Sequence, residues 1–306
     1  MRTRYNEFAI AGLLALAAAV TSDAAQAQDF PGCTLPFDSI KESHSIDSSC
    51  GPEGKTTSDA NRLQNIAKNN FCAAGKPVTV TFNTFLKLQQ AAEEQGIPFG
   101  GQNLPDDRSG LKGIYTSSSG NKIGEGSVVR FVAFVVDAHH SNVSNGESVN
   151  CKLRGKEDND IHIMLGASPS TAACSTVTAE MSPHFRPGAW DQIAEINLPY
   201  PVRITGQLFF DASHKPCKGG KGPNPKRSSL WEIHPVYAVD VCSSTTLTGC
   251  GASDESAWTP LGQWLASGEE GMSELRLPSV TKATCSWRGE PVNVKSKESG
   301  TDRRSK

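Results

Sequence analysis

The sequence lacks the features that would assign it directly to a membrane or polyanion-binding class. A membrane-spanning helix needs about 20 apolar residues, and the uncharged apolar run Phe8–Val20 has 13, with no longer run after it. The 30 lysines and arginines are balanced by 32 aspartates and glutamates. Because neither charge dominates, binding to a polyanion would require a local basic patch.

Several catalytic and metal-binding motifs are also missing. The chain has no C-x-x-C pair, which argues against a zinc ribbon or a thioredoxin-type redox site. It has no H-E-x-x-H, no cupin-type H-x-H ahead of a glutamate, no G-x-S-x-G elbow and no P-loop. No motif therefore assigns an enzyme class.

The N-terminus has the three parts of a secretory signal peptide. Arg2 and Arg4 give a positive start, Phe8–Val20 is the apolar core, and Ala25-Gln26-Ala27 is a small-x-small cleavage site. We therefore expect residues 1–27 to be removed and the mature chain to be exported to the bacterial periplasm or the extracellular space, without a transmembrane segment.

All nine cysteines follow the expected cleavage site, which predicts a disulfide framework in an oxidising compartment. They are Cys33, Cys50, Cys72, Cys151, Cys174, Cys217, Cys242, Cys250 and Cys285. Since nine is odd, at least one thiol is free or pairs between chains. The one local pair we predict joins Cys242 to Cys250 around a short Ser/Thr-rich loop.

Composition and patterning predict a mainly β protein with a few helices. Only 37% of residues are apolar, and 28 glycines with 18 prolines indicate many loops. Residues 28–110 form an N-terminal helical and irregular region held by disulfides, with helices expected at Thr57–Asn70 and Phe82–Gln95 and a short strand at Pro77–Thr81. Residues 243–306 form a C-terminal extension with a helix near Trp258–Leu265 and a charged, disordered tail.

Residues 111–242 carry the strongest β pattern. After a short strand near Leu111–Tyr115, five strands are expected, at Val128–Asp137, Asp160–Leu165, Thr176–Met181, Val202–Phe210 and Leu230–Val241. A short helix, Trp190–Ile196, lies between the third and the fourth. This β-β-β-α-β-β order is that of an OB-fold barrel, and Gly206 suits the bend that such a barrel needs. The alternative is an antiparallel sandwich with an added helix.

Three segments also carry a resemblance. The runs DIHIMLG at Asp160–Gly166, VRITGQLFFD at Val202–Asp211 and WEIHPV at Trp231–Val236 resemble an OB-fold-like domain type of uncharacterised exported bacterial proteins. The resemblance covers a little over a third of the chain. It implies the fold and the compartment and brings no catalytic residues.

Acids and histidines lie close together on the expected strands. Asp160 with His162, and Glu232 with His234, are two residues apart, so each pair points to one face of its strand. If Ile161 and Ile163 face the core, Asp160 and His162 face outward, and Glu180 of the third strand can join them. Asp211 and His214 follow the fourth strand.

Two loops flank this predicted patch, and ligands of OB-folds bind at the corresponding loops. The first, 138–158, contains His139, His140 and Cys151. The second, 212–229, carries lysines, Arg227 and His214 but no acid. A disulfide between Cys151 and Cys217 would order both loops, and we take this as a hypothesis.

Three functions fit this pattern. The first is an exported binding module that uses the outer barrel face and the basic loop for an anionic or polar partner. Nucleic acid is not the favoured partner, because the outward positions lack aromatic residues for stacking. The predicted binding residues are Asp160, His162, Glu180, His214, Lys218, Lys221, Arg227, Glu232 and His234.

The second function is a metal-dependent hydrolase, with His162 and His234 as ligands of a divalent ion. The third is a structural or assembly role in the cell envelope, with the acid–histidine pairs as simple hydrogen-bonded pairs. The sequence leaves these alternatives open.

Overall fold

The computed structural model describes residues 44–71, 76–101 and 103–271. In that part of the chain, no helix combines the length and the apolar character needed to cross a membrane. The described residues up to Leu265 belong to one compact unit, and the chain from Ala266 belongs to a second. The predicted signal peptide, the charged C-terminal residues, Cys33, Cys72 and Cys285 lie outside the described residues.

A closed five-stranded barrel forms the centre of the first unit, as the sequence predicts. Its strands are β4 (Val128–His140), β5 (Ile161–Gly166), β6 (Val177–Met181), β7 (Pro201–Phe210) and β8 (Trp231–Cys242). They pair in the order β4-β5-β6-β8-β7, and β7 pairs back onto β4. All pairs are antiparallel except β6 with β8. This arrangement fits an OB-like barrel.

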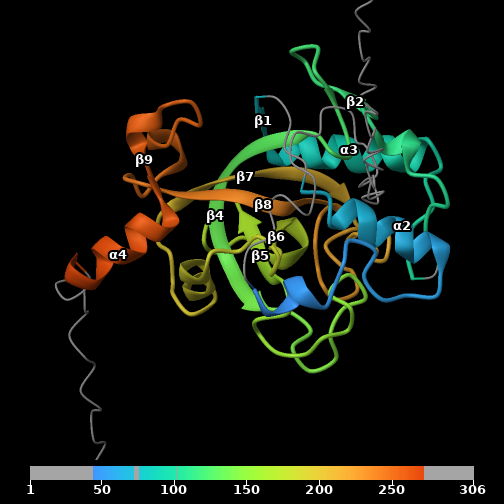
Figure 1. Ribbon diagram of the computed structural model, residues 1–306. Helices are drawn as coiled ribbons and strands as arrows, with labels where there is room; N and C mark the ends of the chain where they lie inside the picture. Colours follow the sequence, from blue (N-terminus) through green and yellow to red (C-terminus); the bar gives the residue numbers. More distant parts are fainter. Residues whose placement is uncertain (1–43, 72–75, 102, 272–306) are drawn as a thin grey trace, which may run out of the picture. The chain divides into compact units, whose positions relative to one another are not determined.

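The long strand β4 closes the barrel because its two halves have different partners. Val128–Phe134 pairs with β7, and the part from Phe134 to His140 pairs with β5 (Figure 1). The pairing of β7 with β8 shifts register on both sides of Gly206. A Cβ atom at Gly206 would lie 2.4 Å from the Pro235 carbonyl oxygen, so only glycine fits this close approach.

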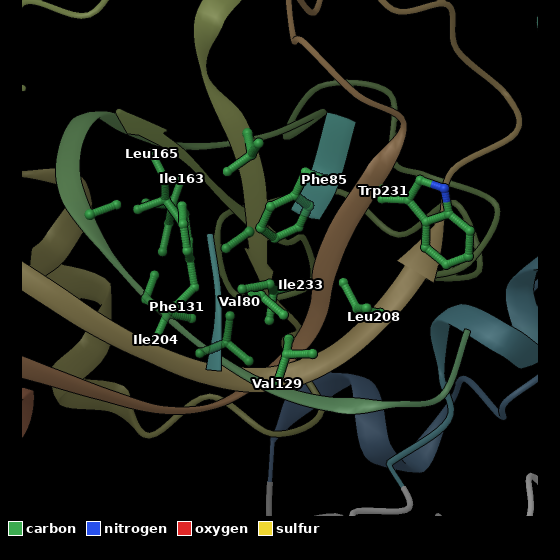
Figure 2. Close-up of a cluster of buried hydrophobic side chains, with 14 of the residues drawn as sticks. Val80, Phe85, Val129, Phe131, Ile163, Leu165, Ile204, Leu208, Trp231 and Ile233 are labelled. Carbon is green, nitrogen blue, oxygen red and sulfur yellow. The ribbon is translucent and has the colours of Figure 1, made fainter. Parts of the chain in front are cut away.

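The barrel interior is apolar and follows the predicted alternation. Ile161, Ile163 and Leu165 of β5 are fully buried in the core, and Figure 2 shows Ile163 and Leu165 beside Phe131. Val177, Ala179 and Met181 of β6 face the same core. The polar residues that alternate with them therefore lie on the opposite face of the sheet.

Helix α3 (Phe82–Glu94) contributes to the same core. Thr81 caps its first turn, and the buried residues Phe85, Leu88 and Ala92 form its apolar stripe. The Phe85 ring packs edge-to-face on Phe131 of β4 with 5.1 Å between centroids. The N-terminal region is thus packed directly on the barrel.

Helix α2 (Asp59–Lys68) buries a polar stripe. Ser58 caps its N-terminus, but its buried residues are Gln64, Asn65, Ala67 and Lys68 rather than a row of large apolar side chains. A helix that buries polar groups must find partners for them. Lys68 finds its partners among the acids of the polar barrel face, whereas Asn65 donates to the Glu53 carbonyl oxygen and accepts from Ser148 Oγ.

The remaining elements are short. Strand β1 (Val78–Val80) pairs in parallel with β4, β2 (Tyr115–Thr116) pairs with β3 (Lys122–Ile123), and β9 (Trp258–Pro260) pairs with β8. Helix α4 is Leu261–Gly271. The 3-10 turns are η1 (Ser45–Ser48), η2 (Ser109–Leu111), η3 (Ala173–Ser175), η4 (Gly188–Ala194), η5 (Leu247–Gly249) and η6 (Glu255–Ala257).

Some predicted elements differ from the structure in type or position. The segment Leu111–Tyr115 is mostly a turn, because η2 ends at Leu111 and β2 begins only at Tyr115. The helix predicted over Trp258–Leu265 starts at Leu261, since Trp258–Pro260 pairs with the edge of β8. The helix between the third and fourth barrel strands is the 3-10 segment η4.

Three disulfides join described cysteines: Cys50–Cys151, Cys174–Cys217 and Cys242–Cys250. The predicted pair Cys242–Cys250 is confirmed. The hypothesis of a Cys151–Cys217 bridge is wrong, because the two loops are fastened to different parts of the chain. Cys151 ties the first loop to the N-terminal region, and Cys217 ties the second loop to the connection between β5 and β6.

Candidate functional site

A row of polar side chains crosses four strands on the outer face of the barrel. His139 of β4 is paired with His162 of β5, and His162 is paired with Glu180 of β6. His162 Nε2 lies 3.1 Å from Glu180 Oε1, and His234 Nδ1 of β8 lies 3.1 Å from Glu180 Oε2. Glu180 is therefore contacted by two imidazoles from neighbouring strands.

Lys68 at the end of α2 inserts its ammonium among the acids of this face. Its Nζ atom lies 2.7 Å from Glu180 Oε2 and 3.3 Å from Asp160 Oδ2. A third carboxylate, that of Glu147, lies 3.2 Å away. The exposed fraction of the Lys68 side chain is only 11%. The polar stripe of α2 thus covers the outer barrel face, which the sequence analysis predicts to be exposed to solvent.

The first loop supplies Glu147 and holds it in place. Glu147 Oε1 accepts hydrogen bonds from Ser141 Oγ at 2.9 Å and Asn142 Nδ2 at 2.6 Å. Asn142 has a positive φ of 44°, a conformation that asparagine tolerates better than most residues. The Cys50–Cys151 disulfide fastens the same loop to the N-terminal region.

The second loop contributes a separate ion network. Arg227 Nη1 donates to Glu232 Oε2 at 2.7 Å and to Asp211 Oδ2 at 3.1 Å. Asp211 Oδ2 also lies 2.5 Å from His214 Nδ1, and Ser213 Oγ donates to the other carboxylate oxygen at 2.5 Å. Arg227 is 1% exposed, so it holds the loop from inside instead of reaching solvent.

The pKa values of these groups are shifted by burial and by one another. Burial opposes charge on Lys68, but Glu147, Glu180 and Asp160 hold the pKa of its ammonium well above the usual value. Burial likewise disfavours the Glu180 carboxylate, yet His162 and Lys68 keep its pKa well below the usual range. Burial and the neighbouring Glu180 raise the pKa of Glu232, so this acid holds a proton to higher pH.

An open cleft of about 440 Å³ lies beside the network. Its walls come from α2, from the ends of β4 and β5, and from the two loops that flank the barrel mouth. Within the described part of the chain, no Phe, Tyr or Trp lines it. The lining residues are Asn61, Gln64, Asn65, Lys68, His139, His140, Ser141, Asn142, Glu147, Ser148, Val149, His162, Glu180, Asp211, Ser213, His214 and Pro225.

The predicted site residues fall into three groups in the structure. His162, Glu180 and His214 line the cleft. Asp160, His234, Glu232 and Arg227 are buried behind it. Lys218 and Lys221 are exposed on the second loop, where Lys218 Nζ lies 3.7 Å from Glu93 Oε1. The binding role assigned to these residues stays a prediction.

Two residues at the centre of the site, Lys68 and Glu147, are not among the predicted ones. Lys68 belongs to the run QNIAKNN, in which Gln64, Asn65 and Lys68 recur at helical spacing and form a polar stripe. That stripe could have been recognised as a buried polar face. Glu147 lies in a loop, where no periodic signal exists.

Among the residues that the structure describes, two groups of side chains present donor atoms close enough for a metal ion. Glu147, Asp160 and His162 form the first group, and Asp160, Glu180 and His234 form the second. Within each group the donor atoms lie within 4.8 Å of one another. The predicted ligands His162 and His234 thus belong to different groups, which share Asp160.

Comparison with known proteins adds no assignment: no protein family, no curated protein and no solved structure matches the chain.

Proposed function

We propose that this protein is an exported binding module whose cleft takes a polar ligand that carries anionic groups. The observation that supports this proposal is the position of the cleft, between the loop after β4 and the loop after β7. These correspond to the loops with which OB-folds bind oligosaccharides and oligonucleotides. Three disulfides favour an oxidising compartment outside the cytoplasm.

The chemistry of the walls favours a hydrophilic ligand. Amide, hydroxyl and imidazole groups dominate the lining, so a ligand with many hydroxyl or amide groups finds both donors and acceptors. Among the described residues no aromatic side chain lines the cleft, which disfavours bases or sugar rings held by stacking. Glu147, Glu180 and Asp211 do line it, so a glycan would hydrogen-bond to the walls through its hydroxyl groups and direct its anionic groups toward the second loop. Such a ligand fits the cleft better than nucleic acid.

The second loop supplies the complementary positive charge. Lys215, Lys218, Lys221 and Lys226 are exposed on it, whereas Arg227 is buried and ion-paired. Exposed lysines attract an anionic ligand without fixing its geometry, because their side chains are flexible and hydrated. The polar cleft then selects the ligand, and the lysines increase its affinity.

Binding of a heparin-derived tetrasaccharide, compared with its desulfated counterpart, tests this proposal by calorimetry. We expect the sulfated probe to bind more tightly, and Lys218→Gln/Lys221→Gln to weaken binding by about 3- to 10-fold at moderate salt. The control Lys76→Gln/Lys122→Gln removes two exposed lysines from elsewhere on the chain. Equal weakening by both double variants, or equal binding of both probes, would reject a role for this loop.

A further inference from the structure

We propose that Glu147, Asp160 and His162 form a divalent metal site at the base of the cleft. This inference is independent of the anionic-ligand proposal, because it concerns an ion held by the protein and not the ligand of the loops. One carboxylate oxygen from each acid and one ring nitrogen of His162 lie within 4.8 Å of one another. A mixed carboxylate and imidazole set suits Zn²⁺ and similar ions.

The three donors need only a small movement to share an ion. Ligand atoms that lie about 2.1 Å from a tetrahedral Zn²⁺ are about 3.4 Å apart. The donor atoms are within 4.8 Å of one another, so each pair has to close by at most about 1.4 Å. Side-chain rotation supplies this without a change in the strands.

Hydrogen bonds already orient both acids. Asn150 Nδ2 donates to Asp160 Oδ1 at 3.2 Å, and Ser141 and Asn142 donate to Glu147 Oε1. Such outer contacts fix the ligand atoms of a metal site before the ion arrives. They leave one oxygen of each carboxylate directed away from these bonds.

The Oδ2 atom of Asp160 is the second observation that indicates an ion. It is buried and accepts no hydrogen bond from any residue that the structure describes, and its charged partner is Lys68 Nζ at 3.3 Å. A buried carboxylate needs a compensating cation, and here Asp160 shares that cation with two other acids. The ammonium supplies only one charge to three carboxylates.

Lys68 therefore competes with a metal ion for the same place. Its Nζ atom contacts Glu147, Asp160 and Glu180, and a divalent ion would neutralise this group more fully than one ammonium. The Lys68 side chain borders the cleft, so it can turn toward solvent when the ion binds. Glu147 and His162 border the cleft too, and this leaves an open coordination position for water or ligand.

Calorimetric titration of the full protein with ZnCl₂, with disulfides intact and without chelator, tests the site. We expect stoichiometric binding that weakens at least about 100-fold in His162→Gln and in Glu147→Gln. Lys68→Met should bind zinc about 10-fold more tightly, because the competing ammonium is gone. Circular dichroism checks that each variant is folded.

The matched control is Asp137→Asn. Asp137 is 53% exposed and forms a surface pair with His139, which is where zinc would bind adventitiously. Binding should survive in this variant. The site is rejected if zinc fails to bind the wild type, or if binding is lost in Asp137→Asn and kept in His162→Gln. Since the probe is the metal alone, failure here leaves the glycan result unaffected, and the reverse also holds.

Discussion

At the scale of single residues, Asp211 links the second loop to the barrel. Its carboxylate accepts from Arg227 and Ser213 and contacts His214, and the side chain is 7% exposed. Removing one member of a buried ion pair commonly costs about 3–5 kcal/mol, because the partner charge stays buried without compensation. We expect Asp211→Asn to lose stability of this order at pH 7, measured by urea unfolding.

The same residue predicts a pH dependence. Burial raises the pKa of Asp211, but His214 and Arg227 outweigh it and hold the pKa well below the usual value. The stabilisation of the fold by the Asp211 carboxylate is thus fully present above about pH 3.9, which is the pKa of this group in the unfolded chain. It is lost as pH falls from there toward the lower pKa of the folded protein. The free energies of unfolding of the wild type and of Asp211→Asn, measured as a function of pH, should therefore approach each other below a pH of about 4. A difference in unfolding free energy that stays constant down to a pH of about 3 would contradict this. The control is Asp106→Asn, which replaces an exposed aspartate.

At the scale of elements, the sequence predicts the barrel strands well, because one face of each strand is buried. The alternation of Ile161, Ile163 and Leu165 with Asp160 and His162 marks both the strand and its inner face. What alternation does not reveal is whether the other face meets water. Here α2 covers it, so acids and histidines expected in solvent are buried in an ion network.

The disulfide Cys174–Cys217 should control the order of the second loop. It joins residues 43 apart in sequence, and the entropy of the closed loop corresponds to about 4 kcal/mol. In Cys174→Ala/Cys217→Ala we expect a loss of about 2–4 kcal/mol and faster hydrogen exchange at residues 213–226.

Cys242→Ala/Cys250→Ala is the matched control for that loop. This disulfide closes only 8 residues beside β9, so it should cost less, about 2–3 kcal/mol. It should also leave exchange at residues 213–226 unchanged. Equal exchange of this loop in both double variants would show that Arg227 and Asp211 order it without the disulfide.

At the scale of the whole molecule, long-range contacts were the part that the sequence could not predict. Disulfide connectivity depends on which loops meet, and Cys151 and Cys217 lie in neighbouring loops yet pair elsewhere. Lys68 contacts Glu147 and Glu180, which are 79 and 112 residues further along the sequence. No local period carries such information. The predicted boundaries between the N-terminal region, the barrel and the C-terminal extension stay a prediction.

These long-range contacts predict that α2 unfolds together with the barrel. Lys68 is bound to Glu147 of the first loop, to Asp160 just before β5 and to Glu180 of β6. The Cys50–Cys151 disulfide fastens the segment before α2 to that loop. Opening α2 alone would leave buried carboxylates without a cation, which is costly. Native-state hydrogen exchange in increasing urea should therefore give amides of α2 and of β5 the same opening free energy. If the opening free energy of the α2 amides is several kcal/mol lower than that of the β5 amides, the helix is a lid over the cleft and not part of the folding unit.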